Sequence, residues 1–427
     1  MIVEYKELSN FSDSTDVKIS DLKPNQTVII KLDTKIGNNA FNSAAKFDAD
    51  EDGNLILNET KAYDGYYEGI IKEGLLMTLS GIQNPIFSWG DAKRPCEFMM
   101  TIETQDHFQN RYDPKAQNPI ALSKNNQKLE EDDELKIIKF KKSYDHGLNY
   151  EKIDKNRAHL HVFTEDFNNP IILIFSSAQK KYELDKAAFF AKNGYTAVCC
   201  QYFAAEYLNP NPSQIPVEIF EDIKDALSEK YNIEKIDLFG NTEGAGLCVL
   251  IAAKYPEFIE KLVLFSPHYY VFQGIDKKAH SLYTIDDKDV PFIPFKIGFF
   301  DQLSLTKKML LKQPVSLTQT YDRCIQRAKN RIQAQLPYKD VKNPILIVYG
   351  QEDKLNDVER WTENIKQDRN DLKTEVISKQ NCGHYINAPY NVQYPKGGLS
   401  TTFGGDIASN AKNSSSLYEE ILEFLNK

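Results

Sequence analysis

Hydrophobic and polar positions alternate in short runs over the first third of the chain. Apolar runs of strand length recur there, separated by Asn, Asp, Gly and Pro: TVIIKL (27–32), GNLILNE (53–59) and EFMMTIE (97–103). Short strands divided by turn-forming residues are typical of antiparallel sheets. Residues 1–122 are therefore predicted to form mainly strands, packed as a sandwich.

From about residue 160 the pattern changes to continuous apolar runs that alternate with segments of helical periodicity. Such an alternation indicates a mostly parallel sheet covered by helices on both faces. The predicted strands are 170–177, 195–203, 235–239, 261–267, 344–350 and 374–379. The predicted helices are 180–194, 216–231, one ending near 255, one beginning near 357, and SLYEEILEFLNK at 416–427.

A polar stretch, SKNNQKLEEDDE (123–134), lies between the two patterns and ends in five consecutive acidic residues. We interpret it as a solvated loop near a domain junction. A chain of 427 residues also exceeds one ordinary domain. The sequence therefore predicts two domains, a β-sandwich at 1–140 and an α/β domain at 141–427.

Composition and chain ends exclude several classes of protein. The formal net charge of −9 argues against a general nucleic-acid-binding protein, which would show a basic face. No run of about 18 apolar residues occurs, so no membrane span is predicted. The N-terminus resembles neither a signal nor a transit peptide, and the C-terminus is not a peroxisomal address, so a cytoplasmic location is expected. The six cysteines fit no metal-binding spacing and are predicted to be buried thiols, with Cys199 and Cys200 on opposite faces of a strand.

The segment IDLFGNTEGAG (236–246) carries the clearest sign of chemistry. It runs from a predicted strand through a Gly-rich corner into a helical pattern. A hydrolase presents its nucleophilic serine in this way, within G-x-S-x-G on a strained turn. The central position in this chain is Thr242 rather than serine.

Two further residues follow predicted strands of the same sheet. Asp353 lies in GQED after strand 344–350, and His384 lies in NCGHY after strand 374–379. The chain order nucleophile, acid, histidine is that of α/β-hydrolases, in which the imidazole accepts the hydroxyl proton and the carboxylate holds the tautomer. Singly, an Asp after a strand often caps a helix, and a His near Gly is often only a loop residue. His268 also follows a strand, but its place in the order is wrong for the base, and it is predicted to be a wall residue.

The segment DADEDGNLILNE (48–59) matches the letters of a calcium-binding EF-hand loop. Its oxygen ligands would be Asp48, Asp50, Asp52 and Glu59. An EF-hand needs an amphipathic helix on each side, however, and both flanks carry Gly or Asn instead. A β-turn rich in Asp and Gly produces the same letters and is the preferred interpretation, so no metal is expected.

Taken together, these motifs resemble the acyl-CoA thioesterase and bile acid-CoA:amino acid N-acyltransferase family over nearly the whole chain. The segments that carry the resemblance are LKPNQTVIIKL, FNSAAKFDADEDGNLIL and YDGYYEGIIKEGLLMTL in the first half, and GYTAVCCQYF, GNTEGAG, PILIVYGQEDKLND, GHYINAPY, Gly404-Gly405 and SLYEEILEFL in the second. The resemblance implies an immunoglobulin-like β-sandwich followed by an α/β-hydrolase domain. In that family the segment corresponding to 47–57 is a hairpin, which further weakens the calcium interpretation.

The resemblance also implies a substrate and a set of roles. The substrate would be a fatty acyl-CoA entering between the domains, without a cofactor, and the acyl group would pass to water or to an amino acid. Thr242 would hold the nucleophile position, Asp353 the acid position and His384 the base position. The oxyanion hole would use the backbone amides of Glu243, Ser177 and Ala178.

Two departures from the family pattern leave the activity open. Family members have Ser or Cys where this chain has Thr242, and their loop after the first hydrolase strand is Gly-rich where this chain has Ser176-Ser177-Ala178-Gln179. One hypothesis is an acyl-CoA thioesterase or acyltransferase that uses a threonine. The other is a pseudoenzyme that binds acyl-CoA or serves as a subunit in a protein assembly. Hydrolysis of another ester is a third, weaker idea.

Overall fold

A computed structural model describes the chain apart from residues 82–86, 108–133, 179–181, 232, 297, 299–305, 309, 312, 314, 371–372 and 395–400. The chain divides into two compact units that are not continuous in sequence. The first holds Met1–Gly147 with Ile386–Gly398 and Asp406–Ser415, and the second holds Leu148–Tyr385 with Leu399–Gly405 and Ser416–Lys427. The predicted boundary between residues 140 and 141 stays a prediction, and the acidic stretch 123–134 falls outside the described residues except for Glu134.

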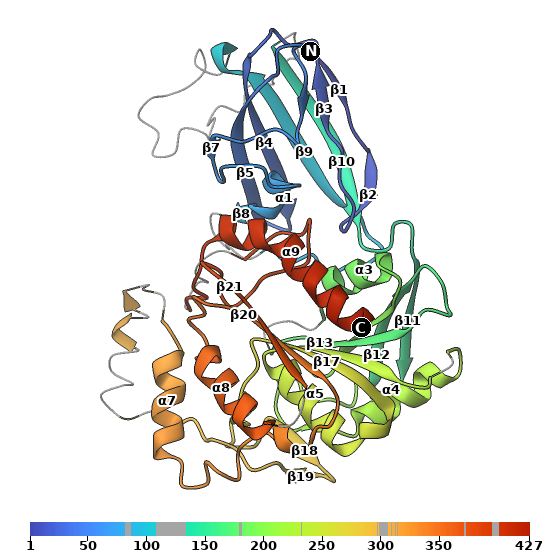
Figure 1. The fold of residues 1–427 in the computed structure, drawn as a ribbon, viewed down its shortest axis with the longest axis vertical. Helices are drawn as coiled ribbons and strands as arrows, with labels where there is room; N and C mark the ends of the chain where they lie inside the picture. The colour runs from blue at the N-terminus through green and yellow to red at the C-terminus, as the bar shows by residue number, and fades with distance from the viewer. Residues whose placement is uncertain are drawn as a thin grey trace. The chain divides into compact units, whose positions relative to one another are not determined.

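The first unit is built from strands, as predicted (Figure 1). Its larger sheet has the order β2-β10-β9-β4-β5-β7, with β8 pairing to β5, and its smaller sheet has the order β1-β3-β6. All pairs are antiparallel except β10 with β2. The bounds are β1 (Ile2–Glu4), β2 (Leu8–Asn10), β3 (Lys18–Ser20), β4 (Thr27–Ile36), β5 (Asn39–Asp48), β6 (Leu55–Ile56), β7 (Asp64–Gly65), β8 (Ser80–Gly81), β9 (Cys96–Thr104) and β10 (Leu135–Ser143), with one short helix, α1 (Gly74–Met77).

Alternation along the strands explains the core of this unit. Val28, Ile30 and Leu32 of β4 are all at most 1% exposed, as expected of a strand face turned to the core. Ile29 on the other face is also buried, in a small cluster with Ala44 and Tyr66. The predicted strand 53–59 is shorter than expected, because only Leu55–Ile56 pairs. The unit is the immunoglobulin-like β-sandwich expected from the resemblance.

The second unit contains an eight-stranded sheet of order β11-β12-β14-β13-β16-β17-β20-β21. The pairs from β14 to β21 are parallel, and β11 and β12 add an antiparallel edge. The bounds are β11 (Asn149–Lys155), β12 (Ala158–Thr164), β13 (Ile171–Phe175), β14 (Thr196–Gln201), β16 (Ile236–Asn241), β17 (Ile259–Phe265), β20 (Ile345–Gly350) and β21 (Thr374–Lys379). A small sheet joins β15 (Ile215–Pro216), β18 (Tyr283–Ile285) and β19 (Lys288–Asp289).

Helices cover both faces of the large sheet, and neighbouring residues of β16 show the two sides. Leu238 is part of a core that includes side chains of α4, α5 and α8. Phe239 points the other way and packs on Phe190 of α3, with the ring centroids 5.6 Å apart. The helices are α3 (Leu184–Lys192), α4 (Ile219–Ser228), α5 (Glu243–Lys254), α7 (Thr318–Arg327), α8 (Val358–Asp368) and α9 (Ile407–Asn426), with short helices η1 (Pro256–Phe258) and η2 (Tyr338–Asp340). This is the α/β-hydrolase arrangement predicted from the sequence.

The last helix is longer than predicted. The apolar pattern begins near residue 416, but α9 begins at Ile407. Asp406 explains the early start, since its side chain accepts hydrogen bonds from the backbone N–H and the hydroxyl of Ser409 at 2.8 and 2.6 Å. A carboxylate before the first turn satisfies donors that a helix leaves open.

Two other predictions can be compared with the structure. All six cysteines are buried, and Cys199 and Cys200 do face opposite sides of β14: Cys200 lies in the α4/α5 core, while the Cys199 thiol donates to the carbonyl of Glu183 beside α3. Across the described part of the chain, no helix combines the length and apolar character needed to cross a bilayer.

Candidate active site

The turn between β16 and α5 has the backbone of a nucleophile elbow. Thr242 stands between them with φ 51° and ψ −100°, a region that a β-branched residue rarely adopts. A Cβ on Gly240 would lie 2.5 Å from backbone atoms of Gly244 and Ala245, and one on Gly244 would lie 2.4 Å from the carbonyl oxygen of Phe175. Glycine is required at both positions because the strand, the turn and the helix meet at backbone contact.

The three residues predicted as a triad are linked in series by two hydrogen bonds. Thr242 Oγ1 is 2.8 Å from His384 Nε2, and His384 Nδ1 is 2.6 Å from Asp353 Oδ2. A carboxylate can only accept hydrogen bonds, so His384 donates from Nδ1 to Asp353 and accepts at Nε2 from the Thr242 hydroxyl. Thr242 is 4% exposed and His384 is 0% exposed, so this chain of hydrogen bonds is shielded from water.

The backbone around Asp353 fixes its carboxylate. Its other oxygen, Oδ1, accepts the backbone N–H groups of Leu355 and Asn356 at 2.8 and 3.0 Å. This turn follows β20 directly, at the carboxyl end of a parallel strand, where ligand sites of open α/β sheets lie. Both oxygens are therefore held, one by the turn and one by His384.

His268 lies in the wall of this region, as predicted, rather than in the triad. Its Nε2 is 3.2 Å from Asn356 Oδ1, and its ring packs against Phe272, Tyr321 and Trp361. Burial lowers the pKa of His268, so the ring is held neutral. A neutral ring donates from Nε2 to Asn356, which itself holds Asp353 through its backbone N–H.

The loop that follows β13, residues 176–178, lies beside the start of α5. The Ala178 backbone N–H donates to Glu243 Oε2 at 2.9 Å. The hydroxyl of Ser177 lies 3.3 Å from that of Tyr385, whose ring stands at 87° to His384. Of the three amides predicted for an oxyanion hole, that of Ala178 is thus already bonded to a side chain. Gln179, the last residue of the predicted loop, lies outside the described residues.

Two contributions were missed in the sequence. The sequence predicts a role only for the backbone of Glu243, and the structure also turns its side chain toward loop 176–178. Asn356 was not singled out, although it stands three residues after Asp353, where an Asx-type turn commonly places a bonded amide. That spacing is the one sequence feature that points to it.

The calcium interpretation finds no support in the described residues. Asp48 accepts the hydroxyl of Thr27 at 2.6 Å, and Asp50 accepts the backbone N–H groups of Asp52 and Asn54 at 3.0 and 2.7 Å. The Asp50 bonds build the turn between β5 and β6, the Asp48 bond joins β5 to β4, and Glu59 lies beyond β6. Within the described parts of the chain, no group of three or more His, Cys, Asp or Glu is placed to hold a metal ion.

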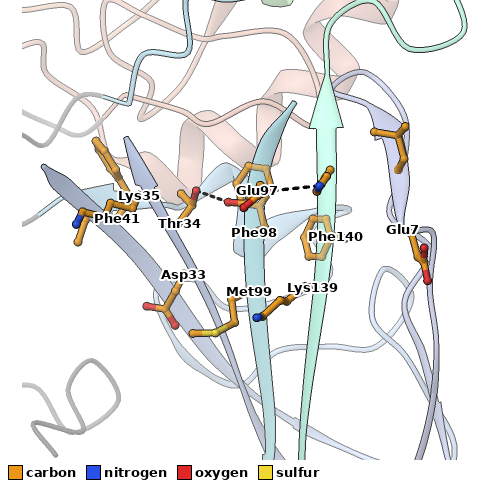
Figure 2. A pocket seen from close by; sticks show the side chains of 13 residues that line it. Glu7, Asp33, Thr34, Lys35, Phe41, Glu97, Phe98, Met99, Lys139 and Phe140 are labelled. Carbon is orange, nitrogen blue, oxygen red and sulfur yellow. Dashed lines mark hydrogen bonds and ion pairs between the residues drawn. The ribbon is translucent and has the colours of Figure 1, made fainter. Parts of the chain in front are cut away.

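The first unit carries a separate groove of about 720 Å³ on its larger sheet. Figure 2 shows its lining, in which Thr34 donates to the carbonyl of Glu97 and Lys141 pairs with the Glu97 carboxylate. The lining residues come from β2, β4, β5, β9 and β10 and include no histidine or cysteine. The lining includes the Thr34 hydroxyl with lysine and glutamate side chains but no histidine, so no hydroxyl there is paired with an imidazole as Thr242 is in the second unit.

The second unit has the fold of an α/β-hydrolase, with an elbow, an acid and a histidine, and the first unit is a β-sandwich. Comparisons with known proteins identify one family with this combination of domains. Residues 12–140 match the family model "Acyl-CoA thioester hydrolase/BAAT N-terminal region", and residues 215–427 match "BAAT / Acyl-CoA thioester hydrolase C terminal". The chain belongs to this acyl-CoA thioester hydrolase/BAAT family.

The chain is also similar to curated and solved proteins. It is 20% identical to mouse acyl-coenzyme A amino acid N-acyltransferase 2, over 96% of this chain and 93% of that protein. A predicted CIB-like hydrolase from Thermoplasma acidophilum is 12% identical with a TM-score of 0.37, covering 65% of this chain and 97% of its own. Naproxen esterase from Bacillus subtilis is 12% identical with a TM-score of 0.38, covering 65% and 91%.

Proposed function

We propose that this protein transfers the acyl group of a fatty acyl-CoA through Thr242, with His384 as the base and Asp353 as the residue that orients it. The observation that carries the proposal is the continuous bonding from the Thr242 hydroxyl through His384 to Asp353. Membership of a family that acts on acyl-CoA thioesters supports the choice of substrate class. A role in acyl-CoA and fatty acid metabolism follows from the same proposal.

The chemistry divides into two half-reactions. His384 Nε2 takes the proton of the Thr242 hydroxyl as Oγ1 attacks the thioester carbonyl carbon. The carbon–sulfur bond then breaks, the coenzyme A thiolate receives the proton from His384, and an acyl-threonine ester remains. Water or the amino group of an amino acid attacks this ester, His384 accepts its proton, and the carboxylic acid or amide leaves while Thr242 regains its hydrogen. Asp353 stabilises the imidazolium in both halves.

A threonine at position 242 is expected to make the reaction slow. Its methyl group restricts the rotamers of the hydroxyl, and a misplacement of about 1 Å can cost roughly a hundredfold in rate. The hydroxyl nevertheless lies 2.8 Å from the histidine, which is hydrogen-bond distance for a nucleophile and its base. The methyl group of Thr242 is therefore expected to hinder the approach of the thioester more than the activation of the hydroxyl.

A second candidate is a pseudoenzyme that binds acyl-CoA, or supports a protein assembly, without turnover. The bond from the Ala178 amide to the Glu243 carboxylate favours it, because this amide is then less able to stabilise an oxyanion. The two candidates differ in one measurable property, turnover that depends on residue 242.

The test is a thioesterase and acyltransferase assay on wild type, Thr242→Ala and Thr242→Ser, with acetyl-CoA, octanoyl-CoA and palmitoyl-CoA. The proposal expects slow turnover in wild type, none in Thr242→Ala, and a kcat about tenfold to a hundredfold higher in Thr242→Ser. A fluorophosphonate probe should label wild type and Thr242→Ser but not Thr242→Ala. Wild-type turnover that survives Thr242→Ala would remove the triad assignment, and a silent wild type and silent Thr242→Ser together would leave the pseudoenzyme.

A further inference from the structure

The Glu243 side chain and loop 176–178 form a contact beside the nucleophile. Glu243 is the first residue of α5 and follows Thr242 directly. Its carboxylate accepts the Ala178 N–H at 2.9 Å, while its backbone carbonyl accepts the hydroxyl of Tyr283. The loop lies directly against this end of α5, because a Cβ on Gly244 would lie 2.4 Å from Phe175 O and 2.6 Å from Ser176 O. The acid and the amide are thus held together by elements that meet at backbone contact.

The Glu243 carboxylate occupies the Ala178 N–H, a donor that the proposed acyl transfer needs for the oxyanion. A tetrahedral intermediate carries its negative charge on the former carbonyl oxygen, and backbone N–H groups next to the nucleophile stabilise it. An amide has one hydrogen, so the Ala178 N–H cannot serve the carboxylate and an oxyanion fully at once. A fixed negative charge at this position also opposes the second negative charge that the intermediate develops.

The charge of Glu243 also acts on the buried surroundings of the elbow. It contributes to raising the pKa of Tyr202 and Tyr283, after burial itself, and it partly offsets the lowering of the pKa of His268 by burial. These three side chains are at most 4% exposed. The carboxylate therefore acts over an interior region of low dielectric, where a charge is screened less than at the surface.

From these contacts we propose that Glu243 is an autoinhibitory residue: its carboxylate holds the Ala178 amide and keeps the oxyanion-binding part of the site closed until it is displaced. The inference rests on the proposed function of Thr242 and deepens it. It assigns the low rate expected of this chain to two separate causes, the methyl group of Thr242 and the carboxylate of Glu243. Removal of either cause alone should raise the rate, and removal of both should raise it further.

The experiment compares Glu, Gln and Ala at position 243, each with Thr or Ser at 242. Glutamine keeps an oxygen that can accept the Ala178 N–H but removes the charge, whereas alanine removes both. Glu257→Ala is the matched control, since it removes the same group from an exposed position on η1 of the same unit. The readouts are kcat and KM for octanoyl-CoA and palmitoyl-CoA, the rate constant of labelling by a fluorophosphonate probe, and the thermal midpoint of each protein.

Glu243→Ala is expected to raise kcat and the labelling rate by roughly tenfold to a hundredfold, below the full effect of about 10²–10³ attributed to one oxyanion donor. KM should change little, because the donor acts on the transition state. Glu243→Gln should lie between wild type and Glu243→Ala, and Glu257→Ala should match wild type. A thermal midpoint that stays constant across the set separates the effect from a change in folding.

Two results would overturn the inference, and they differ in what they leave standing. Measurable turnover that is equal or lower in Glu243→Ala removes the autoinhibitory role but keeps the proposed function. An absence of turnover and of labelling in every protein, including Thr242→Ser with Glu243→Ala, removes both, since opening the site would then reveal no working nucleophile.

Discussion

The two halves of the candidate site differ in how their polar groups are paired. In the half that would activate the nucleophile, Thr242, His384 and Asp353 bond in series, and the spare oxygen of Asp353 is held by the turn after β20. In the half that would stabilise an oxyanion, the Ala178 amide is bonded to the acid of the neighbouring helix. We call the first the ready half, because its bonding is the one that the proposed reaction needs, and the second the closed half, because Glu243 occupies its donor in the proposed inhibition.

This difference depends on what loop 176–178 meets and not on the glycines that the loop lacks. A side chain at residue 243 can reach the loop only because the loop adjoins the first turn of α5, as the tight environment of Gly244 shows. The replacement of glycines by Ser176, Ser177 and Ala178 leaves backbone amides in place, so the loop keeps its donors. The difference lies in the acceptor: the Ala178 N–H donates to the Glu243 carboxylate.

The largest effect is expected from a change that breaks the ready half. In Asp353→Asn the amide oxygen can keep the bonds to Leu355 and Asn356, but the NH₂ group then faces His384 Nδ1. The histidine is forced into the tautomer with its proton on Nε2, which cannot accept from Thr242, and kcat should fall by about 10⁴-fold. Steady-state kinetics of wild type, and of the same change made on Thr242→Ser, measure it.

The control for this prediction is the thermal midpoint, which should move by only a few degrees because the turn is retained. An Asp353→Asn protein that folds normally and keeps its kcat would show that His384 is not the base. The ready half would then lack the role in catalysis that the proposed function gives it.

A second prediction tests the contact between the halves. In Gly244→Ala the new Cβ would meet two backbone oxygens, of Phe175 and Ser176, that cannot rotate away. Strand β13 and helix α5 must separate, so the free energy of unfolding should fall by about 3 kcal/mol, and turnover should fall by roughly a hundredfold as the nucleophile shifts. Denaturant unfolding and the thioesterase assay measure the two effects.

Gly37→Ala provides the matched control, because a Cβ at Gly37 would meet no atom within 4 Å. Only the positive φ of Gly37 opposes this change. Its cost should be about 1 kcal/mol with unchanged turnover. Equal costs at the two glycines would contradict the tight contact between the halves.

The sequence predicts the ready half better than the closed one, for a physical reason. The elbow is local: Gly240, Thr242 and Gly244 lie within five residues, and the strand and helix around them have clear periodicity. The positions of Asp353 and His384 follow from a general property, since parallel strands end at one edge of the sheet. The bond between Glu243 and Ala178 joins residues 65 apart, so it depends on the placement of a loop that periodicity does not describe.

The same limit applies to the fold. Most strands of the parallel sheet were predictable because they are largely apolar, with β21 (TEVISK) the more polar exception. The start of α9, in contrast, depends on one cap at Asp406 in a polar segment. The short pairing of β6 likewise depends on the neighbouring strand β3 and not on the apolar run itself.

The smallest effect on activity is expected at the opposite end of the strand that carries Thr242. Asp237 of β16 is 7% exposed, and its Oδ1 finds no hydrogen-bond partner among the described residues. Burial raises the pKa of this carboxyl to about 7, against the partial opposition of Lys261. The folded protein therefore binds a proton that the unfolded chain has lost, and stability that is present below pH about 4 declines as the pH rises to about 7.

Asp237→Asn should remove this decline. The variant should match wild type near pH 4 and exceed it above pH 7 by about 2 to 4 kcal/mol, seen as a higher thermal midpoint, with turnover unchanged. Asp225→Asn, an exposed carboxylate on α4, is the control and should leave the pH profile of the midpoint as it is. Combined with Gly244→Ala, Asp237→Asn should restore stability at pH 8 without restoring turnover, because the loss at Gly244 lies in the geometry of the site. Recovery of turnover in that double variant would instead assign the loss to folding and contradict the close contact between α5 and loop 176–178.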